Sequence, residues 1–447
     1  AAQVPTHSGF PMTHRAQRQV GKVLVCLVLG PGCTGGRPGD SPGNHTRVLV
    51  GAKIYPSAQA RAIDDGIIII EDGHIVKLGQ RGAVPIPRGS EVLDCSGLVI
   101  VPGFWNSHVH FTEEHWSGAD TASAASLAWH LREMLTRYGF VHVLDTGSWV
   151  ANTQALRRRI ETGEIPGPAI LTTGPGFVPE NASPFYILPA KLPELRTAED
   201  ARVEVAARIR DGADAIKLFT GSVASPTRVV PMPVDIVRAA TREAHRQGKL
   251  VLAHPTNNAG AQAALDGGVD ILAHTTPDGG PWDSAFAGRM KRAGMALIPT
   301  LELWKFELSR KGADSLSLER FLSVAIEQVR AFATQGGEIL FGTDVGYMTV
   351  YDPTDEYRYL QRAGLSFRQL LTTLTAAPAR RFGVAGQRAG TLEPGQDADL
   401  VVLEGNPERD IGALARVRRV YRKGQPIFAA GQVTASRSGT SNRGARI

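Results

Sequence analysis

Two histidines, His108 and His110, stand two residues apart just after an apolar run in the chain. Side chains on a strand alternate between its two faces, so this spacing turns both imidazole rings the same way, as two ligands of one metal ion require. On a helix the same arrangement needs a spacing of four residues. Two unrelated histidines at a strand end would give the same pattern, so the rest of the chain must decide between the two interpretations.

Apolar, strand-like segments alternate with amphipathic helical segments over most of the chain. We predict eight strands, at 98–101, 141–145, 169–173, 215–219, 250–254, 270–274, 296–300 and 338–344. Helices are expected between most of them, including 197–210, 234–247 and 318–334, and two more, at 355–363 and 366–382, follow the last strand. Eight strands in such an alternating series indicate an α/β fold, the (β/α)8 TIM barrel.

Polar side chains mark the carboxyl ends of several predicted strands, where the active site of a TIM barrel lies. In chain order they are His108, His110, Lys217, His254, His274 and Asp344. Any one of them has a structural explanation, such as a helix cap or a lysine that extends to the rim. Together at one barrel mouth they indicate a metal site, and imidazole nitrogens with oxygen donors suit zinc.

The order His-x-His, Lys, His, His, Asp resembles that of the amidohydrolase superfamily of metal-dependent hydrolases. The resemblance extends from about residue 47 to about residue 425, and within the superfamily the chain is most similar to the imidazolonepropionase-related and prolidase-like branch. Supporting phrases are VPGF at 101–104, DAIK at 214–217 and GTLEPGQDADLVV at 390–402.

The resemblance implies a binuclear centre with two divalent ions. His108, His110 and Asp344 would hold the buried ion, and His254 and His274 the more exposed one. A carbamate formed from CO2 on Lys217 would bridge both ions together with a hydroxide. A free Lys217 ammonium would repel two dications, so the lysine must be carbamylated or deprotonated to serve.

The expected reaction is hydrolysis of a C–N bond in an amide, peptide, carbamate or cyclic amide, in a small-molecule or dipeptide-like substrate. Two ions lower the pKa of a bridging water toward roughly 7. Asp344 would take the proton from the nucleophile and pass it to the leaving amine, with Lys217 as the other catalytic residue. Loops that follow the strands supply the candidate substrate contacts Arg228, Tyr186, Trp304 and Tyr347.

Two alternatives stay open at this point. If Lys217 is not carbamylated, one ion held by His108, His110, His254 and Asp344 would serve deamination or ring opening. The second alternative is a non-catalytic binding relative, against which the complete ligand set argues. A metal assay separates the three cases, because they predict about two ions per chain, about one, or none.

Short β segments near both ends of the chain predict a small β-sandwich domain, built from 47–54, 66–71, 74–78, 91–94, 399–403 and 417–421. The predicted division is a leader and linker at 1–46, the first part of the sandwich at 47–97, the barrel at 98–388, the second part of the sandwich at 389–435, and a disordered basic tail at 436–447.

The net charge of the 447 residues is +6, but eight positive charges follow Asp410, where no acidic residue occurs, so the rest of the chain has a net charge of −2. No basic stripe interleaved with aromatic residues is present, so we expect no nucleic-acid partner. Of the three cysteines, Cys95 has no partner if Cys26 is removed with a cleaved leader and Cys33 carries a lipid, and no disulfide framework is then possible. A homo-oligomer is expected on the resemblance alone.

The N-terminal segment resembles an export signal. Basic residues after Met12 precede the apolar run 23–29, and small residues then lead to Cys33, as at a bacterial lipoprotein cleavage site. We therefore expect an exported protein, periplasmic or anchored to a membrane by a lipid on Cys33. A cytoplasmic location is the alternative.

Overall fold

The computed structural model describes residues 46–383 and 389–431. The predicted leader, the lipid anchor at Cys33 and the basic tail 436–447 lie outside these residues. Within the described ranges, no helix is both long enough and apolar enough to cross a membrane.

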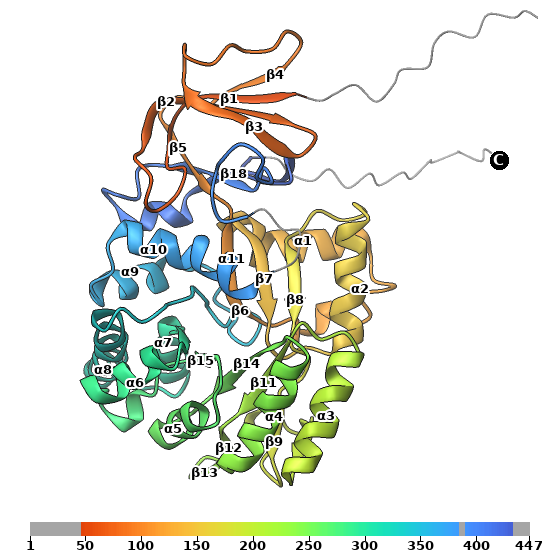
Figure 1. The fold of residues 1–447 in the computed structure, drawn as a ribbon, viewed down its shortest axis with the longest axis vertical. Coiled ribbons are helices and arrows are strands. Elements are labelled where there is room, and N and C mark those ends of the chain that lie inside the picture. Colours follow the sequence, from red (N-terminus) through yellow and green to blue (C-terminus); the bar gives the residue numbers. More distant parts are fainter. Residues whose placement is uncertain (1–45, 384–388, 432–447) are drawn as a thin grey trace, which may run out of the picture. The chain divides into compact units, whose positions relative to one another are not determined.

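An eight-stranded sheet, here called the terminal sheet, combines strands from both ends of the described chain (Figure 1, top). Its strand order is β19-β18-β17-β5-β1-β2-β3, and β4 also pairs with β1. The strands are β1 Arg47–Ile54, β2 Ile63–Glu71, β3 His74–Gln80, β4 Glu91–Asp94, β5 Leu98–Pro102, β17 Leu400–Glu404, β18 Val417–Arg422 and β19 Gln425–Ala429. The β segments near both chain ends therefore form one continuous sheet, because β1 is long enough to pair with β4 along one half and with β5 along the other.

The predicted first barrel strand, 98–101, is the one strand assigned to the wrong sheet. It is β5, which pairs with β1 and β17 in the terminal sheet. The first strand of the alternating series is instead β6, Phe104–Val109, which follows after the single residue Gly103. A fully apolar run fits the middle of either sheet, so its composition does not identify its partners.

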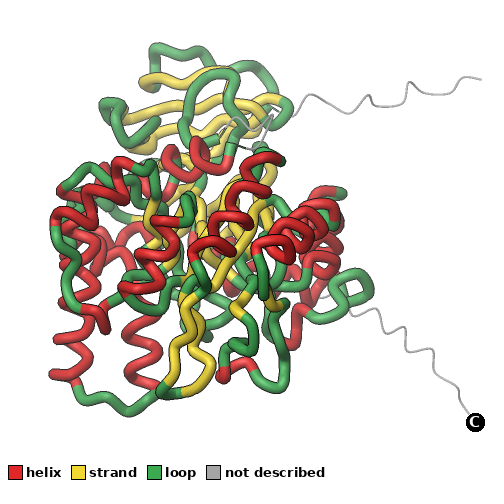
Figure 2. The backbone as a smooth tube through the Cα atoms, turned by 60° about the horizontal axis from the view of Figure 1, so that its bottom comes forward, coloured by secondary structure: helices red, strands yellow, loops and turns green. Residues whose placement is uncertain are grey.

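Seven parallel strands, here called the central strands, form two further sheets. Three of them, β6, β7 (Phe140–Asp145) and β8 (Ala169–Thr172), pair in sequence order. The other four, β11 (Ala215–Phe219), β14 (Leu250–His254), β15 (Ile271–Ala273) and β16 (Ala296–Ile298), also pair in sequence order. Figure 2 shows these strands in the interior of the mixed α/β structure, with helices outside them.

Backbone hydrogen bonds connect the two sets of central strands on both sides. On one side Asp214 N donates to Thr172 O at 2.7 Å. On the other side the segment 338–345 bridges them, since Leu340 N donates to Leu297 O at 2.9 Å and Ser107 N donates to Phe341 O at 2.7 Å. This segment, predicted as the eighth strand, pairs with its neighbours only through isolated bridges.

The helices agree closely with the predicted periodicity, and their bounds are α1 Ala124–Met134, α2 Val150–Glu161, α3 Ala198–Arg210, α4 Val234–Arg246, α5 Asn258–Asp266, α6 Ser284–Arg292, α7 Leu301–Arg310, α8 Ser315–Thr334, α9 Thr354–Arg362, α10 Phe367–Leu374 and α11 Ala376–Phe382. The helix expected at 366–382 is divided at Thr375. Pro378 explains the division. A proline has no backbone N–H to donate to the carbonyl four residues earlier, and in a regular helix its ring clashes with that carbonyl.

Two small pairs of strands lie in loops between central strands. β9 (Val178–Pro179) pairs with β10 (Glu194–Leu195), and β12 (Gly221–Ser225) pairs with β13 (Arg228–Pro231). The first pair closes the base of the loop 180–193 after β8. Short 3-10 helices lie at Glu114–Trp116, Thr136–Tyr138, Phe185–Ile187, Pro277–Gly279 and Ile411–Ala415.

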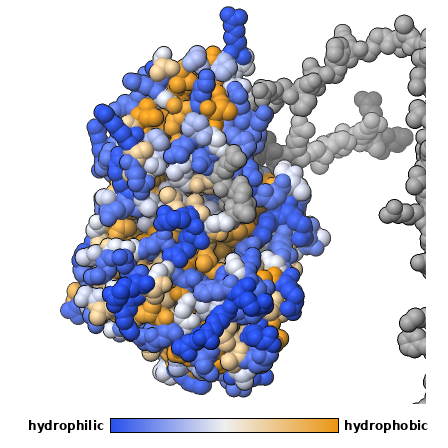
Figure 3. Space-filling model, viewed as in Figure 1, coloured by the Kyte–Doolittle hydropathy of each residue, from blue (hydrophilic) through white to orange (hydrophobic). Residues whose placement is uncertain are grey.

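The largest hydrophobic core lies where the central strands meet the surrounding helices, and includes Phe104, Val143, Leu156 and Val237. A second core lies within the terminal sheet, around Ile68, Ile100 and Val402. On the face seen in Figure 3, hydrophobic residues reach the surface in patches between hydrophilic ones, including over the terminal sheet.

A buried hydrogen bond joins the terminal sheet to the central strands. His142 Nε2 in β7 lies 2.8 Å from Asp399 Oδ2, one residue before β17. The Trp105 ring of β6 stacks on the His142 ring with centroids 4.5 Å apart. The backbone also connects the two parts here, since Gly103 N donates to Asp399 O at 2.9 Å.

Candidate metal centre

The predicted metal ligands all line one cavity of about 810 Å³. They come from β6 (His108), the residues just after β6 (His110), β11 (Lys217), β14 (His254), the residue after β15 (His274) and the segment 338–345 (Asp344). Parallel strands end at the same edge, so side chains at their carboxyl ends converge. The structure therefore brings together the residues that the strand-end pattern selected.

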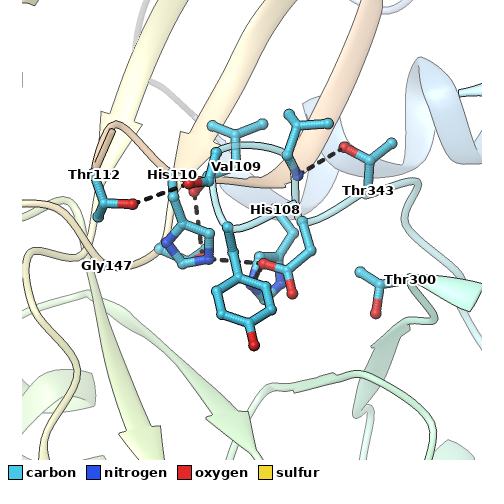
Figure 4. Close-up of polar contacts among 12 residues, drawn as sticks. His108, Val109, His110, Thr112, Gly147, Thr300 and Thr343 are labelled. Atoms are coloured by element: carbon cyan, nitrogen blue, oxygen red, sulfur yellow. Dashed lines mark hydrogen bonds and ion pairs between the residues drawn. The ribbon is translucent and has the colours of Figure 1, made fainter. Parts of the chain in front are cut away.

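The Asp344 carboxylate lies between the two histidines of the His-x-His pair. Its Oδ1 is 2.8 Å from His110 Nε2 and 3.3 Å from His108 Nε2. Figure 4 shows the His108 and His110 rings beside each other, with the His110 contact as a dashed line. One donor atom each from His108, His274 and Asp344 lie within 4.8 Å of one another, so these three could hold a metal ion.

His274 is oriented by a residue that the sequence did not single out. Its Nδ1 lies 2.6 Å from Thr300 Oγ1, and Thr300 is the residue before α7. A hydrogen bond to one ring nitrogen fixes which nitrogen remains for a metal. The His254 ring lies beside that of His274, with centroids 4.7 Å apart.

Two buried polar atoms of the predicted ligands have no hydrogen-bond partner among the described residues, Lys217 Nζ and His108 Nδ1. Burial lowers the pKa of Lys217 to about 7, although the Asp344 carboxylate acts in the opposite direction. An unpaired buried amine costs free energy, so natural structures seldom keep one without a function. The orphaned atoms and the oxygen and nitrogen donors around them fit a metal or a modification of the lysine.

The electrostatics of the site favour neutral imidazoles and an ionised carboxylate, the states that a metal requires. Burial lowers the pKa of His108 and of His254 to about 3, with the Lys217 amine adding to the effect. Burial also lowers the pKa of His274 well below its usual value. For Asp344, burial alone would raise the pKa, but the adjacent histidines outweigh it and hold the pKa well below its usual range.

The backbone around the ligands is strained and closely packed. His274 has φ 77° and Asp344 has φ 71°, both in the left-handed region that side chains avoid. Gly346, with φ 91°, lies so close to the His-x-His segment that a Cβ would be 1.9 Å from the carbonyl oxygen of His110. Such strain is typical of functional sites, where surrounding structure must enforce it.

Three of the four predicted substrate contacts line the cavity, namely Tyr186, Trp304 and Tyr347. Arg228 is exposed at the start of β13 and is not among the lining residues. The cations that line the cavity, apart from Lys217, are Lys191, Arg310 and Lys311.

Aromatic residues that the sequence analysis did not select also line the cavity, namely Trp149, Phe219 and Phe321. Phe219 is the last residue of β11, and Trp149 follows β7 by four residues. Both follow the carboxyl ends of central strands, but the strand-end rule considered polar side chains and therefore did not select them. Nothing in the sequence marks Phe321, which lies on α8.

Comparison with known proteins places the chain in a family. The model of the family described as "Amidohydrolase family" matches residues 99–427. The ochratoxinase of Aspergillus niger is 26% identical over 426 residues, covering 85% of this chain and 86% of that protein. The allantoinase of Deinococcus radiodurans is 26% identical over 467 residues, covering 88% of this chain and 97% of that protein.

Among solved structures, a prolidase-like protein from Bifidobacterium longum has 29% sequence identity and a TM-score of 0.73, covering 86% of this chain and 95% of that chain. Structural neighbours of this kind imply a TIM-barrel fold. The family match covers more than half of the chain, including every predicted metal ligand. The chain therefore belongs to the amidohydrolase family, a family of hydrolases that act on carbon–nitrogen bonds.

Proposed function

We propose that the protein is a binuclear metal-dependent amidohydrolase that cleaves a C–N bond in an amide, peptide, carbamate or cyclic amide. The observation that carries the proposal is the convergence of the predicted ligands on one cavity, where donor atoms of His108, His274 and Asp344 lie within 4.8 Å of one another. Two zinc ions and a carbamate on Lys217 complete the proposed centre.

The proposed scaffold is a closed (β/α)8 barrel. The hydrogen bonds from Asp214 N to Thr172 O, and from the segment 338–345 to β16 and β6, would complete a ring of the seven central strands and this segment. A closed ring explains why residues as far apart as His108 and Asp344 line the same cavity.

Carbamylation of Lys217 is proposed because the amine has no partner where it lies. The side chain is buried, its Nζ has no hydrogen-bond partner among the described residues, and burial outweighs the one carboxylate that favours its charged form, that of Asp344. A carbamate would replace the amine by an anionic oxygen donor, which suits zinc and removes the repulsion between an ammonium and two dications.

In the proposed mechanism, Asp344 moves the protons. When bound, two divalent ions would supply Lewis-acid polarisation of the carbonyl and lower the pKa of a water. Asp344, held between His108 and His110, accepts the proton of the attacking water and delivers it to the leaving nitrogen. Thr300 keeps the His274 ring in one orientation throughout.

The cavity favours a small-molecule or dipeptide-like substrate with an apolar or aromatic side. Its volume of about 810 Å³ exceeds the needs of a single small side chain, and aromatic rings form much of its wall, including Trp149, Phe185, Trp304 and Phe321. Tyr186 and Tyr347 are proposed as contacts. The names of the relatives, an ochratoxinase, an allantoinase and a prolidase-like protein, support a small substrate.

A second candidate is a mononuclear enzyme that deaminates its substrate or opens a ring. The observation in its favour is that the group of donor atoms found within 4.8 Å consists of three residues, enough for one ion. In that case Lys217 would stay unmodified.

Metal analysis combined with reconstitution tests the two candidates. The metal-free protein is reloaded with zinc in the presence and absence of bicarbonate, and is then assayed on N-acyl amino acids, dipeptides, aryl amides and lactams. We expect two ions per chain, bicarbonate-dependent loading, and hydrolysis of at least one compound. One ion per chain without a bicarbonate effect would favour the mononuclear enzyme, and two ions without any hydrolysis would contradict the proposed function.

A pair of lysine variants sharpens the same experiment. Lys217→Met should bind at most one ion and lose the response to bicarbonate. The control is Lys191→Met, because Lys191 lines the same cavity but is exposed and has no partner in the described part of the chain. The control should keep two ions and the bicarbonate effect.

A further inference from the structure

Two tyrosines, Tyr186 and Tyr347, lie next to each other in the wall of the cavity that holds the metal ligands. Their ring centroids are 5.7 Å apart and the ring planes meet at 65°. Tyr186 belongs to the short 3-10 helix Phe185–Ile187, and Tyr347 follows Asp344 by three residues. The two rings thus share one environment, which makes them a natural pair for comparison.

The hydroxyl of Tyr347 is already engaged. It donates a hydrogen bond to Glu307 Oε1 at 2.8 Å. Glu307 also accepts from Arg310 at 2.9 Å and lies 3.7 Å from Lys311 Nζ. This network fixes Tyr347, so its hydroxyl has no donor left for a ligand.

The hydroxyl of Tyr186, in contrast, makes no hydrogen bond to any residue that the structure describes. Its ring packs against those of Phe185 and Tyr347, each at a centroid distance of 5.7 Å. The loop that carries it is closed at its base by the pairing of β9 with β10. A second contact within the loop, from Leu192 N to Ser183 Oγ at 3.0 Å, holds its two sides together. Tyr186 therefore presents a free O–H donor from a constrained position.

The electrostatic surroundings keep this hydroxyl protonated. Burial raises the pKa of Tyr186, and the carboxylates of Asp344 and Glu307 raise it further. Asp344, which handles the proton in the proposed mechanism, lines the same cavity as Tyr186. A protonated phenol can donate a hydrogen bond and cannot act as a base at neutral pH.

We propose that the Tyr186 hydroxyl donates a hydrogen bond to the oxyanion that forms on the scissile carbonyl during C–N hydrolysis, and so makes Tyr186 a catalytic residue. This inference rests on the proposed function. A fixed donor that has no partner in the free protein needs no rearrangement when negative charge develops, which is the condition for strong transition-state stabilisation.

The bond changes are those of amide hydrolysis. The water oxygen forms a bond to the carbonyl carbon while its proton passes to Asp344, and the π electron pair of the C=O bond moves to the carbonyl oxygen. Tyr186 donates to that oxygen without transferring its proton. The C=O bond then re-forms, the C–N bond breaks, and the nitrogen takes the proton from Asp344.

Tyr186→Phe tests the proposal, with Tyr351→Phe as the matched control. On the best amide found in the substrate panel, Tyr186→Phe should lower kcat roughly 10²-fold with little change in KM, since one donor to the oxyanion is removed. Tyr351→Phe removes a hydroxyl of the same type, which donates to Glu113 Oε1 at 2.8 Å, and Tyr351 is not among the residues that line the cavity. This control should keep kcat within about 3-fold of the wild type.

A binding measurement provides a readout independent of turnover. The probe is the phosphonate analogue of the same amide, whose tetrahedral anionic oxygens imitate the oxyanion, titrated by calorimetry into the zinc-loaded proteins. Tyr186→Phe should weaken phosphonate binding by about the same factor as kcat, while binding of the carboxylic acid product stays nearly constant. Metal content and thermal unfolding establish that the variant is folded and loaded.

The outcomes separate this inference from the proposed function. If the wild-type protein hydrolyses the amide and Tyr186→Phe retains both its kcat and its phosphonate affinity within about 3-fold, the role of Tyr186 is wrong and the proposed function stands. A rise in KM with unchanged kcat would make Tyr186 a substrate contact only, which also contradicts the proposal. If the loaded wild-type protein hydrolyses nothing, the proposed function itself fails.

Discussion

Two pairs of a histidine and an aspartate lie in different parts of the molecule and have the same contact distance, although His110 is partly exposed whereas both members of the other pair are buried. His110 and Asp344 are 2.8 Å apart at the metal-ligand cavity. His142 and Asp399 are 2.8 Å apart where the terminal sheet meets the central strands. The same histidine–aspartate contact therefore occurs once at a candidate active site and once where two parts of the fold pack together.

The structural pair is surrounded by partners. Asp399 also accepts a hydrogen bond from Lys423 N at 2.6 Å, and Trp105 stacks on the His142 ring. Both members are buried, and neither is among the residues that line the metal-ligand cavity. The pair thus connects three distant parts of the sequence, β6, β7 and the strands near the C-terminal end.

The pair at the cavity differs in strain and surroundings. Asp344 is in the left-handed region, it is shared by two histidines, and it faces an open cavity beside the orphaned Lys217 amine. An orphaned atom alone does not separate the two sites, because His142 Nδ1 also has no partner among the described residues. Backbone strain, a cavity and several converging donors together distinguish the functional pair.

The largest expected effect comes from neutralising the aspartate of the cavity pair. Asp344→Asn should lower kcat by at least about 10³-fold, because the proton acceptor is lost and a metal ligand is weakened. Steady-state kinetics measure the loss, and near-normal turnover would contradict the role assigned to Asp344.

A backbone substitution next to the same pair should affect stability and metal content together. Gly346→Ala places a Cβ 1.9 Å from the His110 carbonyl oxygen at a φ of 91°. Strain and overpacking should then cost about 4 kcal/mol of unfolding free energy and lower zinc occupancy. Gly364→Ala is the control, because Gly364 has φ 99° with open space around it, and should cost only about 1 kcal/mol. Equal losses in both variants would show that the close approach to His110 is unimportant.

The structural pair should respond in the opposite way. Asp399→Asn should destabilise the protein by about 3 kcal/mol, because it leaves a buried histidine without its charged partner. Zinc content and kcat of the folded variant should stay close to those of the wild type. Urea unfolding and metal analysis provide the test, and a loss of metal without a loss of stability would contradict the distinction between the two pairs.

A smaller effect is expected on the stability of the protein at acid pH. Burial acts to raise the pKa of Asp399, but the combined effects of His142, the Lys423 backbone N–H and Arg422 outweigh burial and hold the pKa below its ordinary value. A carboxyl group whose pKa is lowered by folding stabilises the protein above its unfolded pKa of about 4, and this stability is lost as the pH falls through the lower folded pKa. The stability difference between wild type and Asp399→Asn should therefore shrink below about pH 4 in urea titrations. A constant difference across that range would exclude this contribution.

The sequence predicted most of the strands and helices because their periodicity is local. β1 and β4 agree with the predicted bounds residue for residue. β19 was missed, since Pro426 argues against a strand, and the structure tolerates it because β19 is at the edge of the terminal sheet. Which strands pair with each other was harder to predict from the sequence, because pairing depends on contacts between residues far apart in the chain. The assignment of 98–101 to the wrong sheet is an example.

The convergence of the candidate metal ligands on one cavity was predictable because strand ends and residue types coincide at them, but the rule is not sufficient by itself. Asp145 also ends a central strand. It accepts hydrogen bonds from Ser148, Thr153 and Thr172, and it is not among the residues that line the cavity. Hydrogen-bond partners of this kind, like Thr300 beside His274, come together only when the chain folds. They have no characteristic spacing in the sequence from which they could be predicted.

The position of β5 between β1 and β17 has a consequence for synthesis of the protein. β5 ends at Pro102, whereas β17 begins at Leu400. The ribosome adds roughly 5–20 residues per second, so the roughly 300 intervening residues take on the order of 15–60 s. During that time the nascent chain carries an apolar strand edge whose partner does not yet exist, and such an edge invites pairing with other chains. A chaperone that covers β5 on the ribosome would protect the chain until its last strands emerge.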